Sequence, residues 1–245
     1  MFHEFLYKPL FNALIFIYER LSFNDFGVAI ILLTLLIQIV LLPFFYKSAR
    51  DQALMQRLAP KIKELQNTHK ANKEAQARAL MQLYKDHKVS PFSGLLIMFL
   101  VQLPILIALY QVFLYGFTND ALKDLYSFIP RPESLHPYFF SAINLTTPNT
   151  ILILLASLAQ FFQGKLSLAS TKQSKPGELS TAEMMGKQMV YLGPVLTAFF
   201  FFSLSLPSAV ALYWLTSSLF SLGQQMVIRK RLDRSFSGLS SQSSV

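Results

Sequence analysis

Five long segments of this chain contain no Asp, Glu, Lys or Arg, and they cover roughly residues 27–46, 92–116, 148–163, 188–203 and 208–228. A helix of about 20 apolar residues spans the roughly 30 Å hydrocarbon core of a bilayer, and the first, second and fifth segments reach that length. The third and fourth segments are shorter, so they would cross with little tilt or use flanking aromatic residues. The sequence therefore predicts an all-α integral membrane protein with five transmembrane helices.

The segments between these predicted spans differ in charge. Residues 47–91, 164–187 and 229–245 hold 18 of the 22 basic residues, whereas 1–26 and 117–147 hold 4 basic residues against 6 acidic ones. Basic segments of membrane proteins stay on the cytoplasmic side, so we expect the N-terminus outside and the C-terminus in the cytoplasm. Attraction to anionic lipid accounts for the net charge of +9, and no DNA partner is expected.

The same pattern divides the chain into five parts. Residues 1–25 are predicted to form an amphipathic helix at the outer membrane interface, and 26–46 the first transmembrane helix. Residues 47–91 place apolar residues three or four apart on two otherwise charged stretches, which predicts a basic antiparallel helical hairpin in the cytoplasm. Residues 92–228 hold transmembrane helices two to five, and 229–245 form a short basic and Ser-rich cytoplasmic tail.

The sequence lacks the residue patterns of an enzyme or a metal site. It has no cysteine, and its four histidines lie far apart, outside the spans and without the spacing of metal ligands. A Gly-rich phosphate loop and an HExxH motif are absent too. We therefore expect no catalytic residues, no metal, no cofactor, and a function other than that of an enzyme.

Uncharged polar residues inside the predicted spans are the remaining signal. Thr34 and Gln38 lie one helical turn apart on a shared face of the first span, Gln102 lies in the second, and Ser217 in the fifth. Hydrogen bonds between helices, worth about 0.6–2 kcal/mol each in a bilayer, account equally well for any single one of these residues. For Thr34, Gln38 and Gln102 together we favour a partly hydrated cavity, because an amide bonds readily to water or to a passing peptide.

Several short motifs follow one another in order along the chain. They are TLLIQIVLLP at 34–43, LAPKI at 58–62, LYK at 83–85, KVSP at 88–91, QLPI at 102–105, ALY at 108–110, LPS at 206–208, LYW at 212–214 and QQ at 224–225. Each motif is weak alone. Their order, spacing and predicted topology over roughly residues 5–232 resemble the YidC/Oxa-type membrane protein insertases, in the short five-span bacterial form.

The resemblance implies a five-helix core around a hydrophilic groove that is open to the cytoplasm and to lipid but closed on the outside. It places Thr34 and Trp214 at groove positions that face the substrate helix. The family usually carries an arginine where this chain has Gln38, so a fixed positive charge cannot attract acidic substrate segments here. We expect groove hydration and hydrogen bonding to act instead. The candidate groove residues are Thr34, Gln38, Gln102, Tyr213, Trp214 and Ser217, and the candidate hairpin contacts are Arg57, Lys61 and Lys63.

The function implied is that of an insertase and chaperone for small membrane proteins, working without nucleotide hydrolysis as a multi-pass protein of the bacterial plasma (inner) membrane. Its expected partners are newly made membrane proteins and the lipid bilayer, with the general secretory channel and the ribosome as further candidates. Two alternatives stay open. A structural assembly factor for a membrane complex would need no groove, and a small-solute transporter or channel would usually show inverted repeats or charges within the membrane.

Overall fold

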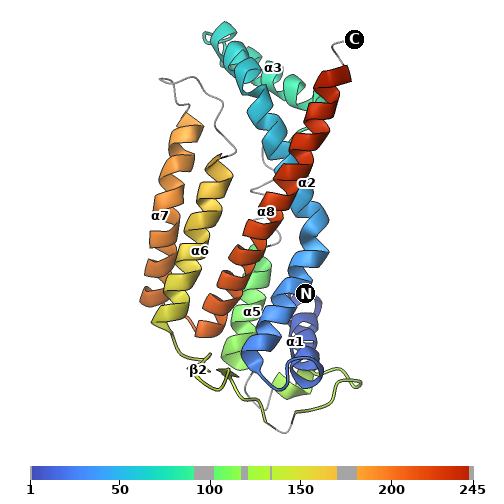
Figure 1. Cartoon of the computed structure of the whole chain (residues 1–245), viewed down its shortest axis with the longest axis vertical. Helices are drawn as coiled ribbons and strands as arrows, with labels where there is room; N and C mark the ends of the chain where they lie inside the picture. Colours follow the sequence, from blue (N-terminus) through green and yellow to red (C-terminus); the bar gives the residue numbers. More distant parts are fainter. Residues whose placement is uncertain (1, 91–101, 117–120, 133, 170–180, 243–245) are drawn as a thin grey trace.

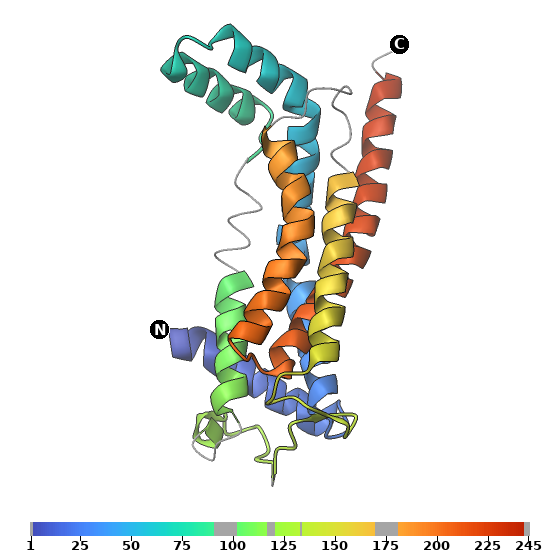
Figure 2. The ribbon, with the colours of Figure 1, turned by 90° about the vertical axis from the view of Figure 1, so that its left-hand side faces the viewer.

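The computed structural model describes residues 2–90, 102–116, 121–132, 134–169 and 181–242 (Figure 1). Within these residues the chain is mainly helical, as predicted, with a single small pair of strands. The long helices are α2 (Phe26–Thr68), α6 (Thr150–Ala169), α7 (Thr181–Ser203) and α8 (Ser208–Gln242), and the shorter α5 (Leu103–Tyr115) lies among them. They run side by side along the long axis of the molecule (Figures 1 and 2).

Helix α8 is the central element of the bundle. It packs against α2 on one side and α6 on the other, while α7 packs on the outer side of α6 (Figure 1). Helix α5 contacts α8 near the end of the bundle where α8 begins. Any site built on α8 therefore faces either α2 and α5 or α6 and α7.

Helix α2 continues without a break from the bundle into the hairpin, although it contains Pro43 and Pro60. It ends at Thr68, and α3 (Lys73–Asp86) returns beside its last turns (Figure 2). The side chain of Asn72 caps α3 by accepting hydrogen bonds from the backbone N–H groups of Glu74 and Ala75, at 3.1 and 3.0 Å. None of the α3 residues is buried, so this hairpin is a surface projection with little core of its own.

The opposite end of the bundle is closed by the N-terminal segment and by the long connection between α5 and α6. The π-helix η1 (His3–Tyr7) leads into α1 (Lys8–Arg20), which runs across the end of the bundle (Figure 2). The connection holds the 3₁₀ helix η3 (Ala121–Asp124) and the antiparallel strands β1 (Tyr138–Phe139) and β2 (Ile143–Asn144).

Helix α1 buries its apolar face against the protein. Phe11, Leu14 and Ile15 are fully buried, and α1 contacts both α2 and α5. The buried Asn12 joins α1 to the segment after η3: its amide N–H group donates to the Asp124 carbonyl at 3.0 Å, and its side-chain oxygen accepts from the Tyr126 backbone N–H at 2.6 Å. The N-terminal helix is thus part of the folded core at this end of the bundle.

The outer faces of α6 and α7 carry a continuous series of exposed large apolar side chains. These residues are Ile151, Leu154, Leu155, Leu158 and Phe162 on α6, and Tyr191, Leu192, Val195, Leu196, Phe199, Phe200 and Phe202 on α7. An exposed apolar surface of this extent is typical of contact with lipid or with another protein.

By length and composition, one helical segment among the described residues, Phe26–Met55, is long and apolar enough to cross a membrane. Leu103–Leu114, Thr150–Leu166 and Val190–Ser203 are shorter apolar helices. Residues 92–101, the first part of the second predicted span, lie outside the described residues. The five crossings and their direction therefore remain predictions.

Candidate functional site

The candidate site is built from α2 and α8, two helices that pack against each other, together with the start of α5. Thr34 and Gln38, which the helical period places on one face of α2, are both buried, at 1% and 2% exposure. The Thr34 hydroxyl donates to the Ile30 carbonyl one turn earlier, at 2.6 Å, so its hydrogen is used within its own helix. The side-chain oxygen of Gln38 is also buried, but it accepts no hydrogen bond from any residue that the structure describes.

Helix α8 presents Tyr213 and Ser217, one turn apart, both of them buried. The amide N–H group of Gln102, the residue just before α5, donates to the Tyr213 hydroxyl at 2.5 Å. This bond joins residues 111 positions apart in the sequence and ties the start of α5 to α8. Two of the predicted groove residues, Gln102 and Tyr213, are thus in contact, and Ser217 lies one turn after Tyr213 on the same face of α8.

Further along α8, polar atoms without partners continue this face. The Ser217 hydroxyl oxygen and the Gln224 amide nitrogen are buried and form no hydrogen bond of normal geometry within the described part of the chain, although the Ser217 hydroxyl lies near the Tyr213 hydroxyl. Gln224 lies seven residues after Ser217, which is about two helical turns along the same face. We call Gln38, Ser217 and Gln224 the polar seam.

A buried polar group without a partner costs roughly 1–3 kcal/mol, and such groups in native proteins are almost always bonded to protein or to water. The described part of the chain holds only six such side-chain atoms, and three of them belong to the seam. Together they offer one acceptor, one hydroxyl and one donor, with no charge. This arrangement can bind water, or the peptide groups and neutral side chains of another chain.

Trp214 takes a different direction from its neighbour Tyr213. Its ring lies edge-on against the ring of Phe201 on α7, with centroids 6.2 Å apart, and the side chain is half-buried. Successive helical residues are about 100° apart, so Tyr213 and Trp214 cannot share a face. The structure therefore brings Trp214 to the α7 side of α8 and keeps it apart from the Gln102–Tyr213 contact.

Two polar residues of α6 that have a buried side-chain oxygen were not among the candidates predicted from the sequence. The Ser157 hydroxyl oxygen and the Gln160 side-chain oxygen, three residues apart, have no hydrogen-bond partner among the residues described. The Gln160 amide nitrogen would lie 3.7 Å from a Cβ placed at Gly193, so this side chain faces α7. The signal in the sequence is the same one that identified Thr34 and Gln38: polar residues at helical spacing in a charge-free span.

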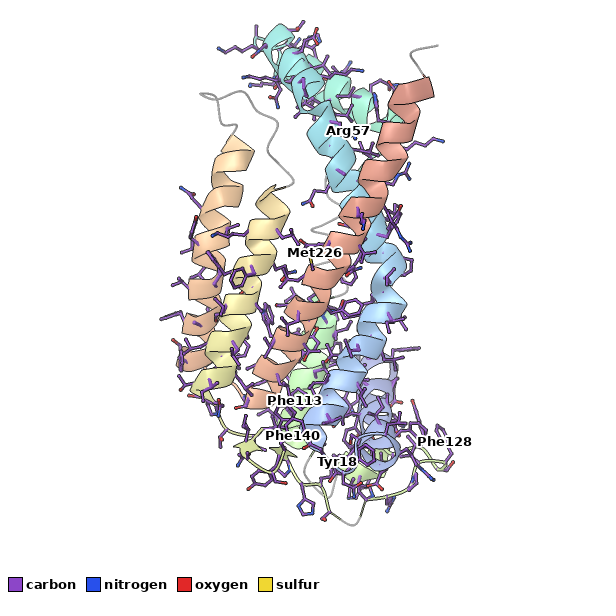
Figure 3. All side chains as sticks on the ribbon, in the orientation of Figure 1. Tyr18, Arg57, Phe113, Phe128, Phe140 and Met226 are labelled. Atoms are coloured by element: carbon purple, nitrogen blue, oxygen red, sulfur yellow. The ribbon has the colours of Figure 1, made fainter. Side chains whose placement is uncertain are left out.

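The hairpin candidates are all exposed. Arg57, Lys61 and Lys63 lie on the part of α2 beyond the apolar segment, and Figure 3 shows Arg57 at the hairpin end of the molecule. One residue on this stretch behaves differently: Asp51 is 2% exposed, and one carboxylate oxygen has no hydrogen-bond partner in the described residues. Sequence reasoning missed Asp51, because an acid beside several basic residues looks like part of a solvated surface.

This chain is similar to known proteins over most of its length. The sequence profile of the family described as the 60Kd inner membrane protein matches residues 16–235. Proteins named membrane protein insertase YidC from Francisella tularensis, in subspecies novicida (strain U112), mediasiatica (strain FSC147) and tularensis (strain SCHU S4 / Schu 4), are each 36% identical over 207 residues. The aligned region covers 84% of this chain and 33% of each relative. The chain therefore spans about a third of the length of these relatives.

Proposed function

Because this chain belongs to the 60Kd inner membrane protein family, which confirms the resemblance seen in its motifs, we propose that it is a membrane protein insertase and chaperone. It inserts small membrane proteins, and helps them fold, without hydrolysing a nucleotide. We place it in the bacterial plasma membrane with five crossings, its N-terminus outside and its C-terminus in the cytoplasm.

The observation that carries this proposal is the polar seam, whose unpaired atoms lie on α2 and on α8, two helices that pack against each other. Gln38 and Ser217 present buried, uncharged polar atoms that form no hydrogen bond in the described structure, within the charge-free stretches of α2 and α8. A purely structural contact between two membrane helices would pair such atoms with each other. A hydrated path for another chain requires polar atoms that are free to bond to water or to that chain.

The proposed mechanism follows from the cost of moving polar groups through lipid. A charged side chain at the centre of a bilayer costs at least roughly 2.5–3.5 kcal/mol. A wet path beside Gln38 and Ser217 shortens the apolar distance that the tail of a substrate must cross. The apolar span of the substrate then moves sideways into lipid, which is favourable by roughly 0.3–0.6 kcal/mol for each Leu, Ile, Phe or Val.

We assign the proposed groove residues different roles, according to the hydrogen bonds that each one forms. Gln38 and Ser217 are available to bond to a passing chain, whereas Thr34 and Gln102 already have partners in Ile30 and Tyr213. We therefore assign to the Gln102–Tyr213 contact the task of holding α5 on α8, and to Thr34 that of shaping the wall. Trp214, packed edge-on against Phe201, would contact the substrate on the α7 side of α8.

The exposed basic residues Arg57, Lys61 and Lys63 mark the hairpin as the receiving surface in the cytoplasm. A substrate, the ribosome or the general secretory channel would meet the protein there. No charged residue lies in the proposed path from Thr34 to Gln38, so insertion should not depend on attraction between a groove cation and an acidic tail.

The proposal is tested by reconstituting the purified protein in liposomes and adding a small single-span substrate. Insertion is scored as protection of the translocated tail from protease, against empty liposomes. The decisive variant is Thr34→Leu with Gln38→Leu, which makes the α2 wall apolar. The matched control is Thr216→Val, because Thr216 is buried next to Ser217 but its hydroxyl is bonded to the Leu212 carbonyl at 2.8 Å.

Protection that exceeds empty liposomes, falls in the double variant and persists in Thr216→Val supports an insertase with an uncharged polar groove. Protection that survives the double variant keeps the insertase and removes these residues from its path. Absence of protection with folded protein supports the assembly-factor alternative, and solute flux in the same liposomes without protection supports a transporter or channel.

A further inference from the structure

Two turns at the N-terminal end of the bundle hold phenylalanine side chains in an unusual backbone conformation. Phe23 and Asn24 have φ angles of 54° and 59°, and Phe140 and Ser141 have φ angles of 49° and 56°. The left-handed region is rare for bulky residues, and strained residues persist only where neighbouring structure fixes them. Phe23 is 99% exposed and Phe140 71%, so the two turns direct aromatic rings away from the protein.

One carboxylate fixes both turns. An oxygen of Asp25 accepts a hydrogen bond from the Val28 backbone N–H at 2.8 Å and so caps the start of α2. The other oxygen accepts from the Phe140 backbone N–H at 2.5 Å, at the tip of the β1–β2 hairpin. The turn before α2 and the hairpin tip are therefore a single unit, although more than a hundred residues separate them.

Gly27 brings the hairpin still closer to α2. A Cβ placed at Gly27 would lie 2.2 Å from an atom of the Phe139 ring, so only glycine lets this ring lie against the first turn of the helix. The Phe139 and Phe140 rings are 4.4 Å apart between centroids. Phe139 thus packs inward on α2, while its neighbour Phe140 stays outside.

This unit lies at the boundary of the apolar part of α2. The segment long and apolar enough to cross a membrane begins at Phe26, three residues after Phe23. Figure 3 shows Phe140 at the same end of the molecule. Leu21 and Phe16, at the adjacent end of α1, are 57% and 43% exposed, and they extend the apolar surface around Phe23.

We propose that Phe23 and Phe140 form an aromatic anchor that enters the membrane–water interface at the N-terminal end of α2, with Asp25 as its positioning residue. Phenylalanine is among the apolar residues that interfacial segments bury at the boundary between headgroups and acyl chains. The exposed Arg20, three residues before Phe23, suits the phosphate groups of lipid, because its long stem can lie along apolar surface while its charge stays in water. A lipid surface fits this position better than a soluble partner, because the anchor continues directly into the membrane-crossing segment.

The anchor would fix the depth of α2, and thereby the depth of Gln38 and the polar seam in the bilayer. It rests on the membrane location of the chain and not on insertase activity. Its test therefore gives a result whether or not the protein inserts substrates.

The absence of cysteine from the chain allows clean site-specific labelling. Single variants Phe23→Cys and Phe140→Cys, labelled with a nitroxide and reconstituted in phosphatidylethanolamine–phosphatidylglycerol vesicles, report depth through their accessibility to oxygen and to a water-soluble nickel chelate. Leu36→Cys, exposed in the middle of the apolar part of α2, is the lipid reference, and the exposed Ser134→Cys is the aqueous reference.

We expect oxygen-to-nickel accessibility ratios at residues 23 and 140 that lie between the two references and well above that of Ser134. Ratios equal to that of Ser134 would overturn the anchor. Low accessibility to both reagents would overturn it in favour of a protein contact. Adding Asp25→Ala to Phe140→Cys should increase label mobility and lower the ratio at residue 140, and an unchanged label would remove the positioning role from Asp25.

Discussion

Gln38 is the residue whose replacement tests the proposed groove most directly. Its side-chain oxygen is buried and forms no hydrogen bond within the described residues, so replacing Gln38 with alanine breaks no hydrogen bond of this oxygen that the structure shows. Gln38→Ala would remove one hydrogen bond to water or to the substrate, while the space left behind can still admit water. A net hydrogen bond is worth about 1 kcal/mol, which corresponds to about a fivefold change in rate.

We therefore expect Gln38→Ala to slow insertion by about fivefold at most, measured as the initial rate of protease protection in proteoliposomes. Gln38→Arg should be tolerated, because the added charge would reach the same wet path. The Thr216→Val control should insert at the unchanged rate. Complete loss of insertion by Gln38→Ala, in protein that is folded and reaches the membrane, would refute a weak hydrogen-bonding role.

Three further predictions concern the N-terminal end of the bundle and its stability against unfolding. Gly27→Ala should destabilise the protein by about 1–3 kcal/mol, because the added Cβ would overlap the Phe139 ring. The matched control Gly223→Ala has open space around the added Cβ and should not destabilise the protein. Comparable unfolding midpoints for the two variants would contradict this prediction. Asn12→Leu should cost about 1–3 kcal/mol in the same assay, because it leaves buried backbone groups without partners; a neutral effect would mean that water replaces the amide. Burial raises the pKa of Tyr18 above its usual 10.0, so the stability of the protein should fall as the pH rises from 10.0 through the raised pKa. In Tyr18→Phe this part of the pH dependence should be absent. An identical alkaline stability profile for the variant would refute the assignment of this pH dependence to Tyr18.

Much of the fold could be predicted because its signals are local. A run without charges, a helical spacing of apolar residues and a polar stretch between two helices are each read from neighbouring residues. Their agreement led to the mainly helical architecture, and the order of the short motifs led to the family. The five crossings stay a prediction, since charge patterning assigns sides to a membrane that the structure itself does not contain.

The site was predictable only as a set of positions. Helical spacing places Thr34 beside Gln38 and Tyr213 beside Ser217, but it does not say which of them has a partner. In the structure Thr34 bonds within its own helix, whereas Gln38 and Ser217 remain without partners among the described residues. Buried Asp51 was missed because nothing local distinguishes a buried acid from an exposed one, whereas Ser157 and Gln160 lie at helical spacing, as Thr34 and Gln38 do, and were not singled out.

The sequence by itself determined where helices form, which faces are apolar and how charge is distributed along the chain, because these depend on residues within a few turns of one another. Only the tertiary structure decided that Gln102 bonds to Tyr213, that Trp214 turns toward Phe201, and that Asp25 joins the start of α2 to the β1–β2 hairpin. Each of these contacts depends on which helices become neighbours. Which helices become neighbours depends on packing over the whole bundle, and no single segment of the sequence determines it.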